Sequence, residues 1–371
     1  MIAVKNDRKL SKFNRFMLWI NYFVVVALIA ACFAKYISPL IFWPIAFAGL
    51  AFPFIFLFNL AFALYWLAQF RRAFMISLAV SVFAYPTAKK YIQFNNSEGS
   101  TVKSFKITSY NSMLFDLYNW RHNKETREKI FGNLADIDSD IICLQEFYTS
   151  EEEGDFNNID SLTKLLNMPN YHAEYTTTLR QYDHWGIATF SRFPIVNRGK
   201  IIFQTRSNNM CIYTDVVIRK DTVRIYNLHL QSISFSKKDN KFLEDIKNGT
   251  ESEEDIEKSK NVLRRLKRAF TKRAKQVEAI KTHMSTCKYK IILCGDFNDT
   301  AASYAYKQLS EKLNDAFIEK GSGFGRTYAG EWPQFRIDYI LFGEQLGCDR
   351  FTRAEETFTD HFPITAHLYL K

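Results

Sequence analysis

The distribution of apolar and polar residues divides the chain into two parts near residue 90. Between Phe16 and Tyr85 nearly every residue is apolar or aromatic, whereas the sequence after Asn95 mixes apolar and polar positions as a soluble domain does. A chain of 371 residues is long enough for one large domain and an appendage. We therefore predict a transmembrane region over residues 1–90 and a separate domain over residues 91–371.

The first part contains uncharged stretches of the length that a membrane-spanning helix requires. Residues 16–33 and residues 39–70 carry no charge, and about 20 residues cross the hydrocarbon core. The pattern predicts transmembrane helices at about 16–33 and 40–68, and a shorter third one at 73–88. A hairpin of buried helices in a soluble protein is the alternative. The long apolar stretches disfavour it, because a soluble helix keeps a polar face.

Basic residues beside these stretches predict their orientation. Five of them precede the first span and the Arg71–Arg72 pair follows the second, so both ends are expected in the cytoplasm. With three spans the rest of the chain emerges outside the cytoplasm, and with two it stays inside. We expect three spans, and hence an integral protein of the cell (inner) membrane with an extracytoplasmic domain. Six scattered cysteines disfavour an oxidising compartment, because they predict no disulfide framework.

The net charge of +10 is concentrated in the apolar part of the chain. Residues 1–100 hold ten basic and two acidic residues, and residues 101–371 hold 39 basic and 37 acidic ones. The second part therefore lacks the overall basicity of a protein whose affinity comes mainly from phosphate-backbone contacts.

Short β-branched and aromatic runs alternate with helical stretches beyond residue 100, which indicates an α/β or α+β domain with one large core. The predicted helices are 124–135, 159–167 and 255–285. The predicted strands are 104–111, 140–146, 186–191, 210–219, 223–230, 289–298, 336–342 and 364–370.

Polar side chains that can ligate a hard cation or move a proton stand at the ends of six of these strands. Each alone has a structural explanation, such as a turn or a satisfied core histidine, but their repetition at strand ends indicates a site. They are Asn111, Glu146, His229, Asp296 with Asn298, Asp338, and Asp360 with His361.

Seven motifs carry a resemblance to a known superfamily over roughly residues 103–371. In chain order they are "SYN", "LQE", "GIATFSRFPI", "NLHL", "GDFN", "RIDYIL" and "TDHFPI". Together they resemble the endonuclease/exonuclease/phosphatase superfamily, which includes deoxyribonuclease I and the neutral sphingomyelinases. The resemblance implies a four-layer sandwich of two mixed β-sheets flanked by helices, and a metal-dependent phosphoric ester hydrolase.

The resemblance also implies a divalent metal and its ligands. It places Glu146 and Asn111 on a catalytic Mg²⁺, for which Mn²⁺ is a possible substitute, with Asp360 close to the metal. Mg²⁺ prefers carboxylate and amide oxygens together with water, so these residue types suit it.

The remaining site residues are assigned to the reaction by the same resemblance. Asp296 would orient or deprotonate the attacking water, and Asn298 would hold a phosphate oxygen. His361, paired with Asp338, would stabilise the transition state or transfer a proton, and His229 would contact the phosphate and assist the leaving group.

The substrate is less well determined by the sequence. A membrane tether and a near-neutral domain favour a lipid headgroup or another small phosphate ester, with the bilayer itself as a partner. A membrane-anchored nuclease and a non-catalytic binding protein that keeps the fold are the alternatives. The basic run from Arg264 to Lys275 is either a solvated helix or a face toward anionic lipid or nucleic acid.

Overall fold

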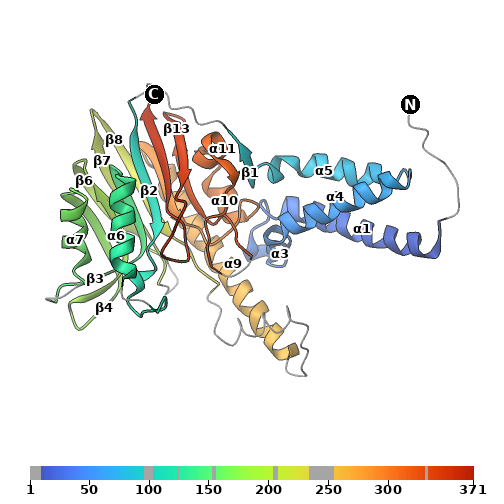
Figure 1. Ribbon diagram of the computed structural model, residues 1–371, viewed down its shortest axis with the longest axis horizontal. Coiled ribbons are helices and arrows are strands. Elements are labelled where there is room, and N and C mark those ends of the chain that lie inside the picture. The colour runs from blue at the N-terminus through green and yellow to red at the C-terminus, as the bar shows by residue number, and fades with distance from the viewer. Residues whose placement is uncertain are drawn as a thin grey trace. The chain divides into compact units, whose positions relative to one another are not determined.

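The computed structural model divides the chain into two compact units (Figure 1). One unit consists of Met1–Ile92 and Asp299–Lys307, and the other consists of Gln93–Asn298 and Gln308–Lys371. The structure describes residues 10–95, 103–122, 125–152, 156–203, 208–233, 255–330 and 333–371. Residues 234–254, which precede the basic run and include the acidic residues Glu251, Glu253 and Glu254, lie outside the described residues.

Three longer helices form the first unit. They are α1 (Lys12–Phe33), α4 (Phe52–Ala68) and α5 (Phe74–Ala88), joined by the short helices α2 (Pro39–Phe42) and α3 (Ile45–Leu50). Helix α1 begins at Ser11, whose hydroxyl accepts a hydrogen bond from the N–H of Asn14, as N-cap residues do. Of the described helices, α1 is the one long and apolar enough to cross a membrane, while α4 and α5 are shorter apolar helices.

The predicted span at 40–68 is divided into three helices by prolines. Pro39 lies in the first turn of α2, Pro44 precedes α3, and Pro53 lies in the first turn of α4. Proline fits the first turn of a helix but cannot continue one, because it has no N–H to donate. One uninterrupted helix over this stretch is therefore absent from the described residues, and α4 alone supplies the long element.

The helical unit contains a buried polar network and exposes many large apolar side chains. Asn21 donates to the hydroxyl of Ser77 and accepts from the indole N–H of Trp66, at 2.8 and 2.9 Å. Asn59 donates to the carbonyl of Ser77 and to the hydroxyl of Ser81, both at 2.8 Å. Large apolar residues are exposed around this network, among them Phe16, Trp19, Phe23, Val26, Ile41, Phe58, Leu64, Val82 and Phe83. The described surface of this unit is therefore strongly apolar.

A segment from far along the chain completes the helical unit. Ala302, in the stretch Asp299–Lys307, packs in one apolar cluster with Leu28 of α1 and Phe52 of α4. The ammonium group of Lys90 lies 4.6 Å from the ring centre of Tyr306. The unit is therefore discontinuous in sequence.

Two six-stranded mixed sheets form the second unit. The first has the order β10 (Leu313–Asp315), β12 (Asp338–Gly343), β9 (Lys290–Asp296), β8 (Asp221–His229), β7 (Met210–Ile218) and β6 (Ile195–Ile201). The second has the order β13 (Leu346–Arg353), β14 (Ile364–Leu370), β2 (Phe105–Asn111), β3 (Ile141–Ser150), β5 (Asp183–Ser191) and β4 (Asn170–Leu179). The short strands β1 (Ile92–Phe94) and β11 (Ser322–Phe324) pair separately.

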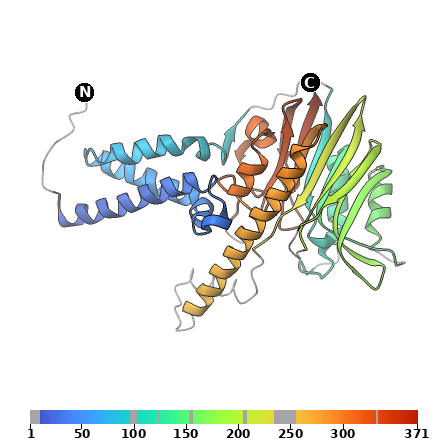
Figure 2. The same ribbon diagram turned by 180° about the vertical axis from the view of Figure 1, so that it is seen from behind.

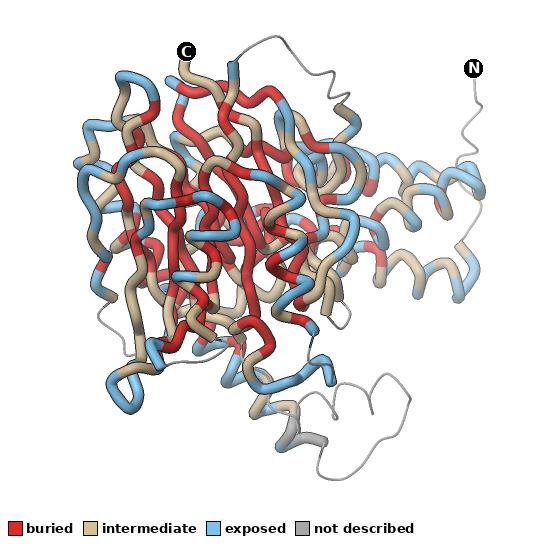
Figure 3. The backbone as a smooth tube through the Cα atoms, turned by 60° about the vertical axis from the view of Figure 1, so that its left-hand side comes forward, coloured by how far each residue is buried: buried red, intermediate tan, exposed pale blue. Residues whose placement is uncertain are grey.

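The sheets pack face to face and helices cover their outer faces (Figures 1 and 2). Alternate residues of each strand point to opposite faces, so Ile141 and Cys143 enter the core between the sheets. Ile142 and Leu144 of the same strand pack instead with α6 (Thr126–Ile137) and α7 (Asn158–Leu165). The buried residues follow the strands (Figure 3). The predicted four-layer sandwich is therefore confirmed.

Helix α9 (Asp255–Ser285) covers the outer face of the first sheet. Its buried residues include Phe270, Val277 and Ile280, and the ring nitrogen Nδ1 of its His283 is hydrogen-bonded to the hydroxyl of Tyr226 on β8 at 3.0 Å. In the described part of this unit the remaining helical segments are η1 (Met113–Asp116) and α11 (Ala316–Lys320), while α10 (Tyr304–Leu309) spans the boundary between the two units in sequence.

Gly295 is a position where only glycine fits, and it tests the packing of β9 on β8. Its φ is +139°, and a Cβ there would lie 1.9 Å from the carbonyl oxygen of Leu228. We expect Gly295→Ala to lower the thermal unfolding midpoint sharply or to prevent folding. Gly132→Ala is the matched control, because a Cβ at this exposed site on α6 meets nothing within 4 Å. A normal unfolding midpoint for Gly295→Ala in a thermal melt would contradict the close approach.

Candidate active site

The polar residues predicted from the sequence meet at one edge of the sandwich. Strands β2 and β3 run parallel, as do β8 and β9, so their carboxyl ends lie at common edges. His229 at the end of β8, Asp296 at the end of β9 and Asp338 at the start of β12 are register partners across three adjacent strands. The amide of Asn111, at the end of β2, donates to Asp296 across the sandwich at 3.3 Å.

A β-bulge directs Glu146 into this edge. The register of β3 against β5 shifts between Leu144 and Phe147, and Glu146 has a φ of +46°. A bulge of this kind turns a side chain away from the regular alternation of a strand. Its carboxylate lies 3.7 Å from Nε2 of His229, and its side chain is 34% exposed, which leaves it accessible.

Asp296 is the most enclosed carboxylate of the site. It is 1% exposed, and its Oδ1 accepts the backbone N–H of Asn298 at 2.7 Å. Its Oδ2 accepts the side-chain amides of Asn298 at 3.0 Å and of Asn111 at 3.3 Å. Burial raises the pKa of Asp296 to about 6, although the charge of His361 opposes the rise.

Asn298 supports this carboxylate rather than pointing into open space. Its φ is +52°, a left-handed conformation that asparagine adopts more readily than most residues. Its Nδ2 donates to the carbonyl of Leu230 and to Asp296, both at 3.0 Å. Both N–H groups of the amide have acceptors, so a substrate oxygen would have to replace one of them.

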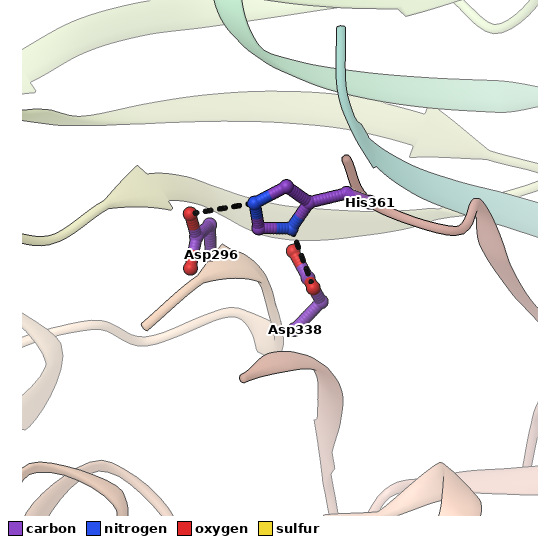
Figure 4. Close-up of side chains that lie close together, drawn as sticks. All are labelled: Asp296, Asp338 and His361. Atoms are coloured by element: carbon purple, nitrogen blue, oxygen red, sulfur yellow. Dashed lines mark hydrogen bonds and ion pairs between the residues drawn. The ribbon is translucent and has the colours of Figure 1, made fainter. Parts of the chain in front are cut away.

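His361 bridges Asp338 and Asp296 (Figure 4). Its Nδ1 lies 2.9 Å from Oδ2 of Asp338, and its Nε2 lies 3.8 Å from Oδ2 of Asp296. Burial lowers the pKa of His361, but the carboxylates of Asp338 and Asp296 outweigh burial and hold the pKa well above its ordinary value. The imidazolium form is therefore stable at neutral pH.

The pKa of His229 is shifted in the opposite direction from that of His361. Its Nε2 lies 3.6 Å from Asp296 and 3.7 Å from Glu146. Burial lowers the pKa of His229 below its ordinary value, even though Asp296 opposes the effect. The site therefore holds one charged and one neutral imidazole about the same carboxylate, and environments that separate two pKa values in this way are typical of acid–base pairs.

The carboxylates of the site have no lysine or arginine partner among the described residues. Burial and the nearby charge of Asp360 raise the pKa of Glu146. Among the described residues no lysine or arginine forms a salt bridge with Glu146, Asp296, Asp338 or Asp360. Carboxylates that repel one another at an accessible edge suit a divalent cation.

Among the described residues, one cluster of carboxylate and imidazole groups lies close enough together to hold a metal ion. Ligand atoms of Asp296, Asp338 and His361 lie within 4.8 Å of one another. The hydrogen bond from Nδ1 of His361 to Asp338, however, describes a His–Asp pair better than two ligands. Glu146 and Asp360 are the carboxylates whose charges remain unbalanced, and these residues fit a hard cation. Asn111 accepts the N–H of Met113 with Oδ1 at 3.1 Å, which leaves one lone pair.

Three buried polar residues around the site were not identified from the sequence. Gln145 donates to Oδ1 of Asn227 at 2.7 Å and so joins the two sheets behind Glu146. Thr359 donates to the carbonyl of Asn111 at 3.1 Å and accepts the N–H of His361 at 3.0 Å. Gln145 and Asn227 stand within the motifs "LQE" and "NLHL", so their position beside predicted site residues was the available signal.

Comparison with known families agrees with this fold. The endonuclease/exonuclease/phosphatase family matches residues 117–361, and a domain of unknown function (DUF8431) matches residues 14–91. The family match covers well over half of the chain, so the chain belongs to the endonuclease/exonuclease/phosphatase family. Enzymes of this family hydrolyse phosphoric esters, and this chain is such a hydrolase by class. No curated protein matches it in sequence.

Solved structures share the sandwich at low sequence identity. A family protein from Leptotrichia buccalis is 16% identical with a TM-score of 0.50, and 72% of this chain covers all of it. One from Beutenbergia cavernae is 13% identical with a TM-score of 0.52 and 72% coverage of both chains. A mannosyl-6-phosphatase from Bacteroides thetaiotaomicron is 16% identical with a TM-score of 0.50, and 72% of this chain covers all of it. These similarities concern the fold.

The raised pKa of Asp296 predicts a gain in stability when its charge is removed. The pKa rises from 3.8 to about 6 on folding, so the penalty is absent below pH 3.8 and complete above about 6. At pH 7.5 it amounts to about 3 kcal/mol. In EDTA, the change in thermal unfolding midpoint caused by Asp296→Asn should therefore be more favourable at pH 7.5 than at pH 3.5. The same change in midpoint at both pH values would show that the ionised carboxylate carries no such penalty.

Proposed function

We propose that this protein is a membrane-anchored phosphoesterase that depends on Mg²⁺, or on Mn²⁺ in its place. Its substrate would be a lipid headgroup or another small phosphate ester. The observation that carries the proposal is the enclosed carboxylate of Asp296, which contacts Asn298 on one side and a His361–Asp338 pair on the other. Such an arrangement prepares a base and a cationic donor next to each other.

Asp296 is the group that would orient the attacking water and accept its proton. The two hydrogen bonds from Asn298 fix the direction of both carboxylate oxygens. A buried carboxylate with a pKa of about 6 is a better base than an exposed one and is still ionised at neutral pH. Asn298 would in addition hold a phosphate oxygen once the substrate displaces one of its acceptors.

His361 would supply positive charge and a proton to the phosphoryl group. Asp338 holds Nδ1 and keeps the ring protonated, so Nε2 is the atom that faces the reaction. His229 is neutral and lies between Asp296 and Glu146, where it would contact the phosphate and assist the leaving group.

Glu146, Asn111 and Asp360 would hold the divalent cation. When bound, the cation would supply charge neutralisation for the phosphoryl oxygens and for the leaving oxygen. Removal of the cation by a chelator should therefore abolish turnover.

The helical unit supports a substrate at a membrane. Its exposed residues are largely apolar and it contains a buried polar network, so a bilayer would satisfy its surface. Residues 101–371 are close to neutral, with 39 basic and 37 acidic residues. Such a charge favours an ester held at the membrane over a long polyanion in solution. The expected topology of three spans with an extracytoplasmic catalytic unit remains part of the proposal.

Membrane anchoring is tested with the full-length chain in isolated membranes. We expect the protein to stay in the pellet after extraction with alkaline carbonate and to dissolve in detergent. Release by carbonate would show that the helical unit does not span the bilayer. A protease added to sealed vesicles of known orientation reports the side of the membrane on which residues 93–298 lie.

Catalysis is tested with the purified full-length protein in nanodiscs. Sphingomyelin, glycerophospholipids, inositol phosphates, a sugar phosphate, plasmid DNA and RNA are compared with Mg²⁺ and with EDTA. We expect hydrolysis of a lipid or small ester with DNA intact. Asp296→Ala and His361→Ala should each lower kcat by about 10³-fold or more without unfolding the protein.

Matched controls come from the same strands and residue types. Asp221 lies at the start of β8, at the end opposite to His229, and its carboxylate binds Lys290. His367 lies on β14 and is paired with Lys106 in register. Asp221→Ala and His367→Ala should keep near-normal turnover. Unchanged turnover in the Asp296 and His361 variants would exclude the assigned site, and cleavage of DNA alone would make the protein a tethered nuclease.

A further inference from the structure

One arginine of the basic run in α9 is buried beside the active-site segments. Arg273 is 1% exposed, whereas Arg264, Lys267 and Lys275 of the same helix are exposed. A buried guanidinium is costly unless acceptors surround it. Its Nη1 donates to the carbonyl of Gln231 at 3.0 Å and to the carbonyl of Asn298 at 2.7 Å. The interpretation of the basic run as a solvated or lipid-facing helix therefore does not apply to this residue.

Gln276, three residues further along α9, extends the contact. Its side chain is also 1% exposed, and its Oε1 accepts the backbone N–H of Gln231 at 2.9 Å. Arg273 and Gln276 thus bind both the carbonyl and the N–H of one residue. Residues three apart on a helix lie on the same face, so the pair acts from one surface of α9.

The two segments held by Arg273 are those that follow β8 and β9. Gln231 stands two residues after His229, and Asn298 stands two residues after Asp296. The segments are also joined directly, because the N–H of Leu230 donates to the carbonyl of Asp296 at 2.9 Å. Asn298 in turn donates to Leu230 and to Asp296. Arg273 is therefore linked to Asp296, the proposed base, by hydrogen bonds through one intervening residue, Asn298.

We propose that Arg273 is a positioning residue of the active site, with Gln276 as its partner. It holds the carbonyl of Asn298 and keeps that residue in its left-handed conformation, from which the Asn298 amides reach both oxygens of Asp296. It also fixes the chain that follows His229. This inference rests on the proposed function, because it concerns the geometry of the proposed base.

A planar guanidinium suits this position better than an ammonium group. One nitrogen, Nη1, serves both carbonyls, and the fork of N–H groups keeps a fixed direction. Lysine at the same position would supply a cation and donors without that fixed direction. Methionine would fill a similar volume and supply neither.

The test compares full-length Arg273→Met and Arg273→Lys with wild type in nanodiscs. The substrates are bis(4-nitrophenyl) phosphate and the ester cleaved in the panel above. For Arg273→Met we expect kcat to fall by about 30-fold or more and KM to change by less than about 3-fold, because misplacement of a catalytic group affects the chemical step. The kcat of Arg273→Lys should be higher than that of Arg273→Met. On a logarithmic scale it should recover about one third or more of the difference in kcat between Arg273→Met and wild type.

The matched control is Lys281→Met on the same helix. Lys281 is half-exposed and binds Gln308 and Glu311 at 2.8 and 2.7 Å, away from the site segments. Its kcat and KM should stay within about 2-fold of wild type. An Arg273→Met protein that folds and keeps kcat within about 3-fold of wild type would overturn the proposal. A rise in KM with unchanged kcat would overturn it as well.

Hydrogen exchange gives a second readout that does not need activity. In Arg273→Met, amide exchange should rise in peptides that contain residues 228–232 and 296–298 and stay constant in β7. Unchanged exchange at both segments would overturn the proposal even if kcat fell. If wild type cleaves no ester while exchange rises as expected, the proposed function fails and the contact by Arg273 stands.

Discussion

The buried carboxylate of Asp296 is the group on which the arrangement of the site depends. It accepts hydrogen bonds from Asn298 and Asn111 and lies within 4 Å of two imidazoles. Burial would make its charge unstable, so each neighbour is either an N–H donor or a ring that can carry positive charge. The two histidines respond differently, because His361 is hydrogen-bonded to a second carboxylate, that of Asp338, whereas burial dominates at His229. Two imidazoles in different surroundings, one paired with Asp338 and one governed by burial, thus flank the same enclosed carboxylate.

The strands predicted from the sequence are those in the interior of the two sheets. The eight predicted ranges correspond to β2, β3, β5, β7, β8, β9, β12 and β14, whereas β4, β6, β10 and β13 at the sheet edges were not predicted. Interior strands are covered on both faces and have continuous apolar runs. An edge strand such as β4, with the sequence NYHAEYTTTL, is half exposed and carries polar residues that resemble a loop.

The site residues at the strand ends could be predicted from the sequence, whereas the residue of α9 that supports them could not. Glu146, Asp296 and His361 stand in short motifs, so their types and order could be interpreted locally. Arg273 could not, because in sequence it is one of several basic residues in a helix. Its importance follows from two backbone carbonyls, of which that of Gln231 lies 42 residues away in the sequence. The division of residues 40–68 into short helices was missed because uncharged length was given more weight than the prolines.

The discontinuous helical unit has a consequence for the order in which the protein is made. Helices α1, α4 and α5 leave the ribosome first, but Ala302 and Tyr306 follow about 200 residues later. The helices must therefore persist without part of their packing while β2 to β9 are synthesised. The last contacts of the apolar unit then form only after the strand that carries Asp296 exists. Assembly of the helical unit and completion of the catalytic unit are in this way linked in time.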